Sequence, residues 1–329
     1  MAVKCGRVLC VDDEPNILRS LQWLLQKEFE VMTAPSGPEG LELVRKHHFD
    51  VVISDQRMPG MIGSEFLREV RKVSPSSMRI LLTGYSDLQA ILSSVNESEV
   101  FRFINKPWNI SELPKAVREA AAISRSSEVA TTALIDPETA VPKAGETILV
   151  IDDDPNTAIL VEGMIGRHAQ IVKATNLAEA IEAFSSNRIG VVLSEAHVGN
   201  LDTTRLLKML KSQHPDVVSV VSSAESDADV AISLINQGQV YRFVPKPVKA
   251  GYLKLAMISA VLKHQELREN PQLHARHRVE KVAEGTQEAL VRDAQEVAKK
   301  IAPQGASNDA NGSSFLQRLS GGFKRLLGR

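Results

Sequence analysis

Three aspartates in the N-terminal third of the chain follow short apolar runs. Asp12 and Asp13 come after RVLCV, and Asp55 comes after FDVVIS. Carboxylates that converge in one hollow repel one another, and a divalent cation is needed to hold them together as anions. Oxygen ligands with retained waters suit Mg²⁺ or Mn²⁺ better than zinc, which prefers histidine and cysteine. The three aspartates therefore predict a magnesium or manganese site.

Two further side chains, Lys106 and Thr83, follow later apolar runs. Lys106 can pair with a phosphoryl group or with Asp55, and Thr83 can donate a hydroxyl hydrogen bond to a phosphoryl oxygen. Asp55 is then left as a nucleophile that can form an aspartyl-phosphate. The turn sequence MPG at 58–60 presents Asp55 instead of burying it. Alone, Asp55 would be only an acidic residue that ends a strand; the set predicts phosphoryl chemistry.

Apolar strands and amphipathic helices alternate around these residues. Such alternation predicts an α/β fold, a doubly wound parallel sheet of the flavodoxin type. Right-handed crossovers bring the carboxyl ends of the first, third, fourth and fifth strands to one edge, where the candidate residues would meet. We expect strands at 7–11, 30–33, 51–54, 79–82 and 100–104, a helix from Pro15 through Leu25, and helices at 38–46, 63–73, 87–96 and 111–123.

The pattern restarts at an offset of 140 residues, as the pairs Asp12 and Asp152 or Lys106 and Lys246 show. A constant offset indicates a duplicated domain with almost no net insertion. The second copy should end with a helix at about 251–264. Its retained counterparts of the candidate residues are Asp152, Asp153, Ser223, Phe243 and Lys246, whereas Glu195 stands at the position of Asp55.

The predicted organisation is two tandem domains with a C-terminal tail. We expect a first domain at 1–125, a linker at 126–145, a second domain at 146–266, a helical extension at 267–303, a flexible tether at 304–313 and a basic amphipathic segment at 314–329. That last segment can lie on an anionic membrane surface or dock in a partner's groove. Its Gly321-Gly322 pair costs about 2 kcal/mol of helix propensity, and a tail that folds back or stays disordered is the alternative.

Composition narrows the function classes. A net charge of −1 gives no global attraction to nucleic acid, and the region after His264 lacks a compact helix-turn-helix, so no nucleic-acid partner is expected. Cys5 and Cys10 are too few and too close for a disulfide framework or a zinc site. Without an apolar membrane span or a secretory signal, the expected location is the cytoplasm, with the segment 314–329 as the one candidate for membrane association.

The motifs VDDEPN, VVISDQRMPG, ILLTGYSD and FRFINKPW resemble the receiver domain of bacterial two-component response regulators, the CheY-like family. The resemblance covers residues 5–124 and, less fully, 145–264. The sequences DQRMPGM and RFINKPW are similar to those of receivers that precede HD-GYP phosphodiesterase domains. The resemblance implies roles for single positions: Asp55 as phosphoacceptor, Asp12 and Asp13 as the metal-binding pair, the Arg57 backbone carbonyl as a further metal ligand, Thr83 and Phe103 as the pair that rearranges on phosphorylation, Lys106 as the phosphoryl contact, and a cis peptide before Pro107. Simple core packing is the alternative role for Phe103.

The second copy departs from the family pattern at Glu195 and at 198–200, where VGN replaces MPG. The extra methylene of Glu195 would push its carboxylate to where a phosphoryl group would sit. We therefore expect a pseudo-receiver that is not phosphorylated, in which Glu195 pairs with Lys246. A decayed site kept for dimerisation or docking is the alternative, and a homodimer is compatible with either.

The resemblance implies a signalling protein and not an enzyme. A histidine kinase or a histidine phosphotransfer protein would donate a phosphoryl group to Asp55, and the added charge would change contact with a downstream protein. A phosphatase would need an acid/base carboxylate close to Asp55, where Gln56 and Arg57 stand instead. A docking scaffold that never carries phosphate is the other alternative.

Overall fold

The computed structural model describes residues 4–84, 99–126, 142–199, 201–224, 236, 240–277 and 292. The chain divides into two compact units, 1–134 and 135–329, each of which is considered by itself. Several expectations lie outside the described residues: the helix at 87–96, most of the linker, the helical extension beyond 277 apart from residue 292, the tether, and the segment 314–329 with its membrane or partner contact.

The first unit contains a five-stranded sheet whose strands are all parallel, in the order β2-β1-β3-β4-β5. This confirms the predicted doubly wound α/β fold. Each of the three central strands, β1, β3 and β4, is buried almost throughout, which explains why their sequences are mostly apolar. The strands are β1 (Arg7–Val11), β2 (Glu30–Ala34), β3 (Val51–Asp55), β4 (Met78–Thr83) and β5 (Arg102–Asn105).

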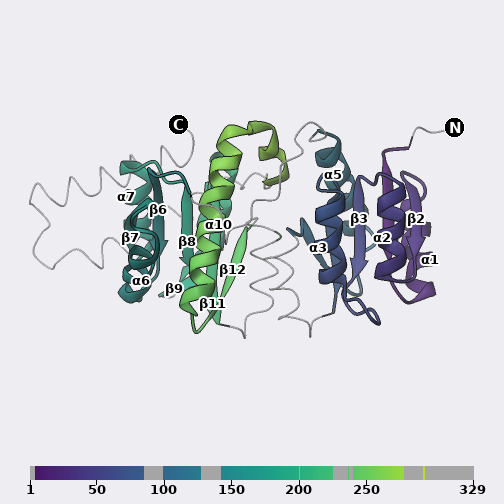
Figure 1. Cartoon of the computed structure of the whole chain (residues 1–329), viewed down its shortest axis with the longest axis horizontal. Helices are drawn as coiled ribbons and strands as arrows, with labels where there is room; N and C mark the ends of the chain where they lie inside the picture. The colour runs from purple at the N-terminus through teal and green to yellow at the C-terminus, as the bar shows by residue number, and fades with distance from the viewer. Residues whose placement is uncertain are drawn as a thin grey trace, which may run out of the picture. The chain divides into compact units, whose positions relative to one another are not determined.

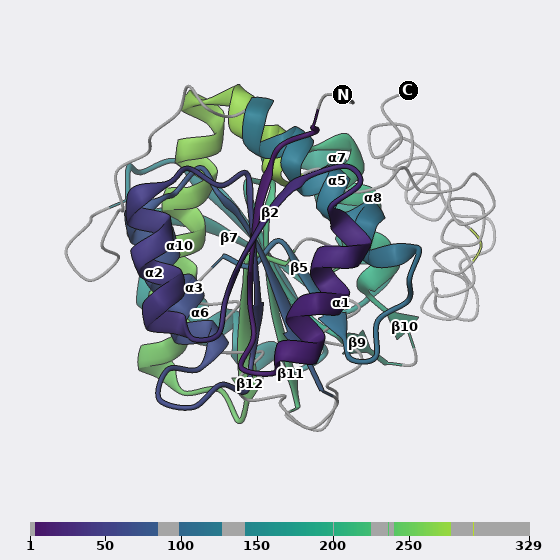
Figure 2. The ribbon, with the colours of Figure 1, turned by 90° about the vertical axis from the view of Figure 1, so that its right-hand side faces the viewer.

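Within the described residues of this unit, two pairs of helices cover the sheet, α1 with α5 on one face and α2 with α3 on the other (Figures 1 and 2). On the first face, Leu21 and Leu25 of α1 and Val117 of α5 are fully or almost fully buried against the strands. Burial of apolar area on both faces stabilises the sheet and fixes its carboxyl edge in place. The helices are α1 (Pro15–Leu25), α2 (Gly37–Lys46), α3 (Gly63–Val73) and α5 (Glu112–Ser126).

The second unit repeats this architecture with a parallel sheet in the order β12-β11-β8-β6-β7 (Figure 1). Its strands are β6 (Glu146–Ile151), β7 (Ala169–Ala174), β8 (Val191–Glu195), β11 (Val218–Ala224) and β12 (Arg242–Lys246). Its helices are α6 (Pro155–Ile165), α7 (Leu177–Ser186), α8 (Thr204–Gln213) and α10 (Ala250–Glu269), followed by the 3₁₀ helix η1 (Pro271–His277).

Two features of the second unit differ from expectation. The helix α10 continues to Glu269, past the end expected at about 264, and its last turn is held because Leu267 is buried and Arg268 contacts Glu146 at the start of β6. A short antiparallel hairpin of β9 (His197–Val198) and β10 (Leu201–Asp202) stands where the first unit has its MPG turn.

Strand register aligns the candidate residues at the carboxyl edge of the first sheet. Val11 is paired with Ser54, Asp55 with Leu82, and Thr83 with Asn105, so the residues just beyond these positions meet at one edge. Among the described helices, none combines the length and the apolar character that a membrane crossing needs.

Candidate functional site

The three predicted aspartates do converge. Each of Asp12, Asp13 and Asp55 offers a carboxylate oxygen, and these oxygens lie within 4.8 Å of one another. Asp12 is fully buried, and Asp55 is also buried, so the expectation that the MPG turn presents Asp55 instead of burying it was wrong. Asp13 is exposed at the rim. Three carboxylates at this separation match the all-oxygen donor set that a hard divalent cation takes, so the residues present fit the predicted metal.

Lys106 joins two of these carboxylates. Its Nζ lies 2.7 Å from Asp12 Oδ2 and 2.7 Å from Asp55 Oδ1. Burial raises the pKa of the Asp55 carboxyl, and the hydrogen bond and charge of Lys106 act against this. Burial acts to lower the pKa of the Lys106 amine, but its bonds to Asp12 and Asp55 outweigh that effect and the pKa is raised. The lysine is therefore a fixed cation that offsets part of the acidic charge.

Backbone amides orient the other carboxylate oxygens. The Glu14 N–H donates to Asp12 Oδ1 at 2.9 Å, and the Arg57 N–H donates to Asp55 Oδ2 at 3.0 Å. Both bonds arise in the turns that follow β1 and β3, where Pro15 opens α1 and the MPG sequence redirects the chain. Each buried aspartate thus has a partner on both oxygens, which fixes its direction.

Thr83 and Phe103 are both buried, at the end of β4 and within β5. The Thr83 hydroxyl donates to the Gly84 carbonyl at 3.1 Å instead of to a carboxylate, and the Thr83 carbonyl accepts from the Lys106 N–H at 2.8 Å. The buried ring of Phe103 is compatible with both a switching role and core packing. The Lys106-Pro107 peptide is cis, as expected, and so is Lys246-Pro247.

The second domain has a related cluster with one altered connection. Asp152, Asp153 and Glu195 also offer carboxylate oxygens within 4.8 Å of one another. Lys246 Nζ lies 2.8 Å from Glu195 Oε1 but 3.5 Å from Asp152 Oδ2, which has no hydrogen-bond partner among the described residues. The side chain of Glu195, which is longer than that of Asp55, bonds to Lys246. The short contact between Lys106 and Asp12 in the first domain has no equally short counterpart between Lys246 and Asp152.

Burial raises the pKa of the Glu195 carboxyl, opposed by Lys246 and reinforced by Asp152. The hairpin β9–β10 adds a weak bond from the Gly199 N–H to Asp153 Oδ2 at 3.4 Å, with Gly199 in the left-handed region at φ +59°. Ser223 and Phe243 are buried, like Thr83 and Phe103.

An apolar hollow that the sequence did not predict lies beside Lys106. It has a volume of about 740 Å³ and lies between α1 and the segment after β5. Trp23 and Ile110 line it and are 65% and 70% exposed. The sequence does contain one indication of this hollow. Trp23 is a large apolar residue that lies outside the apolar stripe of α1 that faces the sheet, so its side chain could be expected to face away from the core.

Comparison with known proteins agrees with this geometry. The model of the response regulator receiver domain matches residues 8–118 and 148–258. The hydrogenase transcriptional regulatory protein HoxA of Cupriavidus necator is 41% identical over 120 residues, 36% of this chain and 25% of that protein. The chain thus matches only about a quarter of the length of this relative.

A shorter relative is covered almost completely. Sporulation initiation phosphotransferase F of Bacillus subtilis is 31% identical over 114 residues, 34% of this chain and 91% of that protein. Among solved structures, the receiver domain of an HD domain-containing protein from Pseudomonas fluorescens Pf-5 is 36% identical, over 36% of this chain and 97% of that chain, with a TM-score of 0.36. Since the receiver model matches both of its domains, this chain belongs to the family of response regulator receiver domains and carries two of them in tandem.

Proposed function

We propose that Asp55 accepts a phosphoryl group from a histidine kinase or a histidine phosphotransfer protein and that the chain passes the signal on through protein contacts. The observation that carries this proposal is the double contact of Lys106 with Asp12 and Asp55, 2.7 Å each, beside the exposed Asp13. One Asp55 oxygen would form the new P–O bond while the P–N bond to the donor histidine breaks and the imidazole leaves.

Mg²⁺ or Mn²⁺ would be held by Asp12, Asp13 and Asp55 together with the Arg57 backbone carbonyl. When bound, such a cation neutralises negative charge on the carboxylates and on the incoming phosphoryl group. Lys106 supplies a fixed positive charge to the same oxygens, and Thr83 is placed to turn its hydroxyl from the Gly84 carbonyl to a phosphoryl oxygen. With Thr83 rearranged, the buried Phe103 would change its packing and transmit the modification to the surface.

Glu195 supports the proposal that the second domain is not phosphorylated. Its carboxylate already bonds to Lys246 at 2.8 Å, so a negative group permanently occupies the contact that a phosphoryl oxygen would make. The second domain would then serve as a docking or dimerisation module. We propose no catalytic turnover at Asp55, because Gln56 and Arg57, the two residues that follow it, offer no acid/base carboxylate.

Removal of the cation tests this function. Incubated with acetyl phosphate and Mg²⁺, the full chain should show one slower band on a phosphate-affinity gel, because the acidic cluster then has its charge neutralised. The same incubation with excess EDTA should leave the band at its original position. A chain whose mobility never changes would be a docking scaffold without phosphate and would refute the proposal.

The apolar hollow next to Lys106 is placed to receive the phosphodonor. A protein that delivers a phosphoryl group must cover the rim where Asp13 is exposed, and large exposed apolar side chains beside such a rim favour association. The second domain has Gly163 and Ala250 at the positions of Trp23 and Ile110. The apolar contact is thus confined to the domain that has a phosphoacceptor.

Trp23→Ala should slow phosphotransfer from the histidine kinase that phosphorylates the wild-type chain fastest, by about tenfold or more, since buried aromatic anchors dominate interfaces. Phosphorylation by acetyl phosphate, which needs no docking, should keep its wild-type rate. Ile159→Ala is the matched control, since Ile159 is 58% exposed on α6, the counterpart helix in the second domain. Equal slowing with both phosphodonors would place Trp23 in the chemistry instead of the docking.

A further inference from the structure

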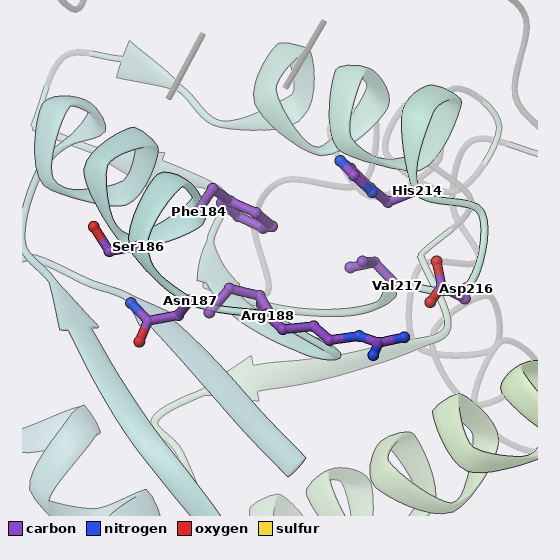
Figure 3. Close-up of a pocket in the computed structure, with 8 residues that line it drawn as sticks. Phe184, Ser186, Asn187, Arg188, His214, Asp216 and Val217 are labelled. Carbon is purple, nitrogen blue, oxygen red and sulfur yellow. The ribbon is translucent and has the colours of Figure 1, made fainter. Parts of the chain in front are cut away.

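A hollow of about 460 Å³ lies in the second domain at the sheet edge opposite to Glu195 (Figure 3). Its wall comes from residues 184–189, which lead into the amino end of β8, and from residues 214–217, which lead into β11. Since β8 has five residues of about 3.3 Å rise each, the hollow and the acidic cluster are separated by the height of the sheet. The hollow is therefore independent of the phosphoacceptor-like site.

One part of this hollow is apolar. Phe184, Ile189 and Val217 line it and are mostly buried, with the ring of Phe184 and the side chain of Val217 pointing into the space in Figure 3. An aromatic ring at the wall of a hollow offers a face on which a planar ligand ring can stack. The volume falls within the range of roughly 300–1,000 Å³ that is usual for small-molecule sites.

The other part is polar and charged, and one of its groups, the Asp216 carboxylate, also acts electrostatically on the buried amine of Lys211. Within the described residues of this domain, the side chains of Arg188, His214 and Asp216 make no hydrogen bond or ion pair, although all three line the hollow. Arg188 and His214 can bind an anionic oxygen, for which the guanidinium fork is well shaped. The Asp216 carboxylate repels a bare anion but accepts hydrogen bonds from hydroxyl or amino groups. Mixed charge of this kind selects a ligand that carries both an anionic group and donors.

At the corresponding positions of the first domain, the side chains contact one another. His48 Nε2 lies 3.2 Å from Ser76 Oγ, and the His47 ring packs edge-on against Phe49 with 6.4 Å between ring centroids. At the same offset the second domain has Arg188 and Asp216 in place of the bonded His48 and Ser76, and the smaller Ile189 in place of Phe49. The substitutions remove the internal pairs, reduce the bulk at this edge, and introduce opposite charges.

We propose that this hollow binds a small anionic molecule with a planar ring and hydroxyl donors, the chemistry of a nucleoside monophosphate. The base stacks on Phe184, the phosphate lies between Arg188 and His214, and the ribose hydroxyls donate to Asp216. The second domain would then receive a small-molecule signal at its amino edge while the first domain receives a phosphoryl group.

Isothermal titration of the full chain with AMP and GMP tests the proposal, with adenosine and inorganic phosphate titrated separately. We expect saturable binding of a nucleotide, and binding of either fragment weaker by about tenfold or more, because each fragment lacks one set of contacts. Arg188→Ala should weaken nucleotide binding by about ten- to a hundredfold, the usual loss for one charge-assisted contact. Arg205→Ala, which removes an exposed arginine of α8 outside the hollow, should bind as the wild type does.

Three results would overturn the inference. They are the absence of saturable binding of both nucleotides at millimolar concentration, equal affinity in Arg188→Ala and wild type, and binding that is lost in Asp13→Asn but kept in Arg188→Ala. The last result would place the nucleotide at the acidic cluster of the first domain. Arg188 is exposed, so the variant should fold, and an unchanged thermal unfolding curve confirms that a loss of binding is local.

Discussion

Asp55→Asn should abolish covalent phosphate on the whole chain. Asparagine has the size of aspartate and can still accept the Arg57 N–H, so the turn after β3 should keep its conformation. Its amide oxygen is neutral and a poor nucleophile, and the chain loses the group that would form the P–O bond. With acetyl phosphate and Mg²⁺, we expect phosphate incorporation at least about a hundredfold below wild type, measured by intact mass and on a phosphate-affinity gel.

The same variant decides the role of the second domain. If Glu195 takes no phosphoryl group, Asp55→Asn leaves no acid-labile phosphate on the protein. Residual phosphate in Asp55→Asn that disappears in the double variant with Glu195→Gln would show that the second domain is phosphorylated after all. Glu195→Gln alone is the matched control and should be phosphorylated as the wild type is.

Gly63→Ala should destabilise the first domain by about 3 kcal/mol or more, since small-to-large changes in closely packed sites cost about 1–3 kcal/mol and a backbone collision adds to that. A Cβ at Gly63 would lie 2.0 Å from the Asp55 carbonyl oxygen and 2.9 Å from Leu81 Cδ1. The carbonyl belongs to the last residue of β3 and cannot move without moving the candidate phosphoacceptor. Urea unfolding followed by tryptophan fluorescence measures the effect, because both tryptophans, Trp23 and Trp108, are in the first domain.

Gly163→Ala provides the contrast. Gly163 lies in α6 of the second domain with open space where a Cβ would stand, so alanine there should stabilise that domain by about 0.5–1 kcal/mol through helix propensity, measured by circular dichroism because the second domain has no tryptophan. A wild-type unfolding midpoint for Gly63→Ala would mean that the turn after β3 is free to shift, and the close approach of α3 to Asp55 would lose its structural importance.

Most of the fold of the first domain could be predicted from the sequence, because buried parallel strands read as unbroken apolar runs. The bounds predicted for β1 and for α3, 7–11 and 63–73, agree with the structure. The convergence of Asp12, Asp13, Asp55 and Lys106 was also predictable, since parallel strands place their carboxyl ends at one edge.

The features that sequence patterns missed depend on contacts between distant segments. The hairpin β9–β10 arises where VGN replaces MPG, and the short run around it has no periodicity to read. The extension of α10 depends on Arg268 meeting Glu146, more than a hundred residues earlier in the chain. The hollow of the second domain between residues 184–189 and 214–217 depends on the size of the side chains that precede β8 and β11. These two segments are far apart in the sequence, so no local pattern predicts the space between them.

The bonding of Lys106 has a consequence for the order of events at the first site. An ammonium group carries three hydrogens, and Asp12 and Asp55 engage two of them. The remaining hydrogen is available to an arriving oxygen before either existing bond is broken. Among the described residues, Lys106 therefore keeps one N–H donor for a phosphoryl oxygen, whereas Lys246 bonds to Glu195, a carboxylate that is part of the chain and cannot dissociate.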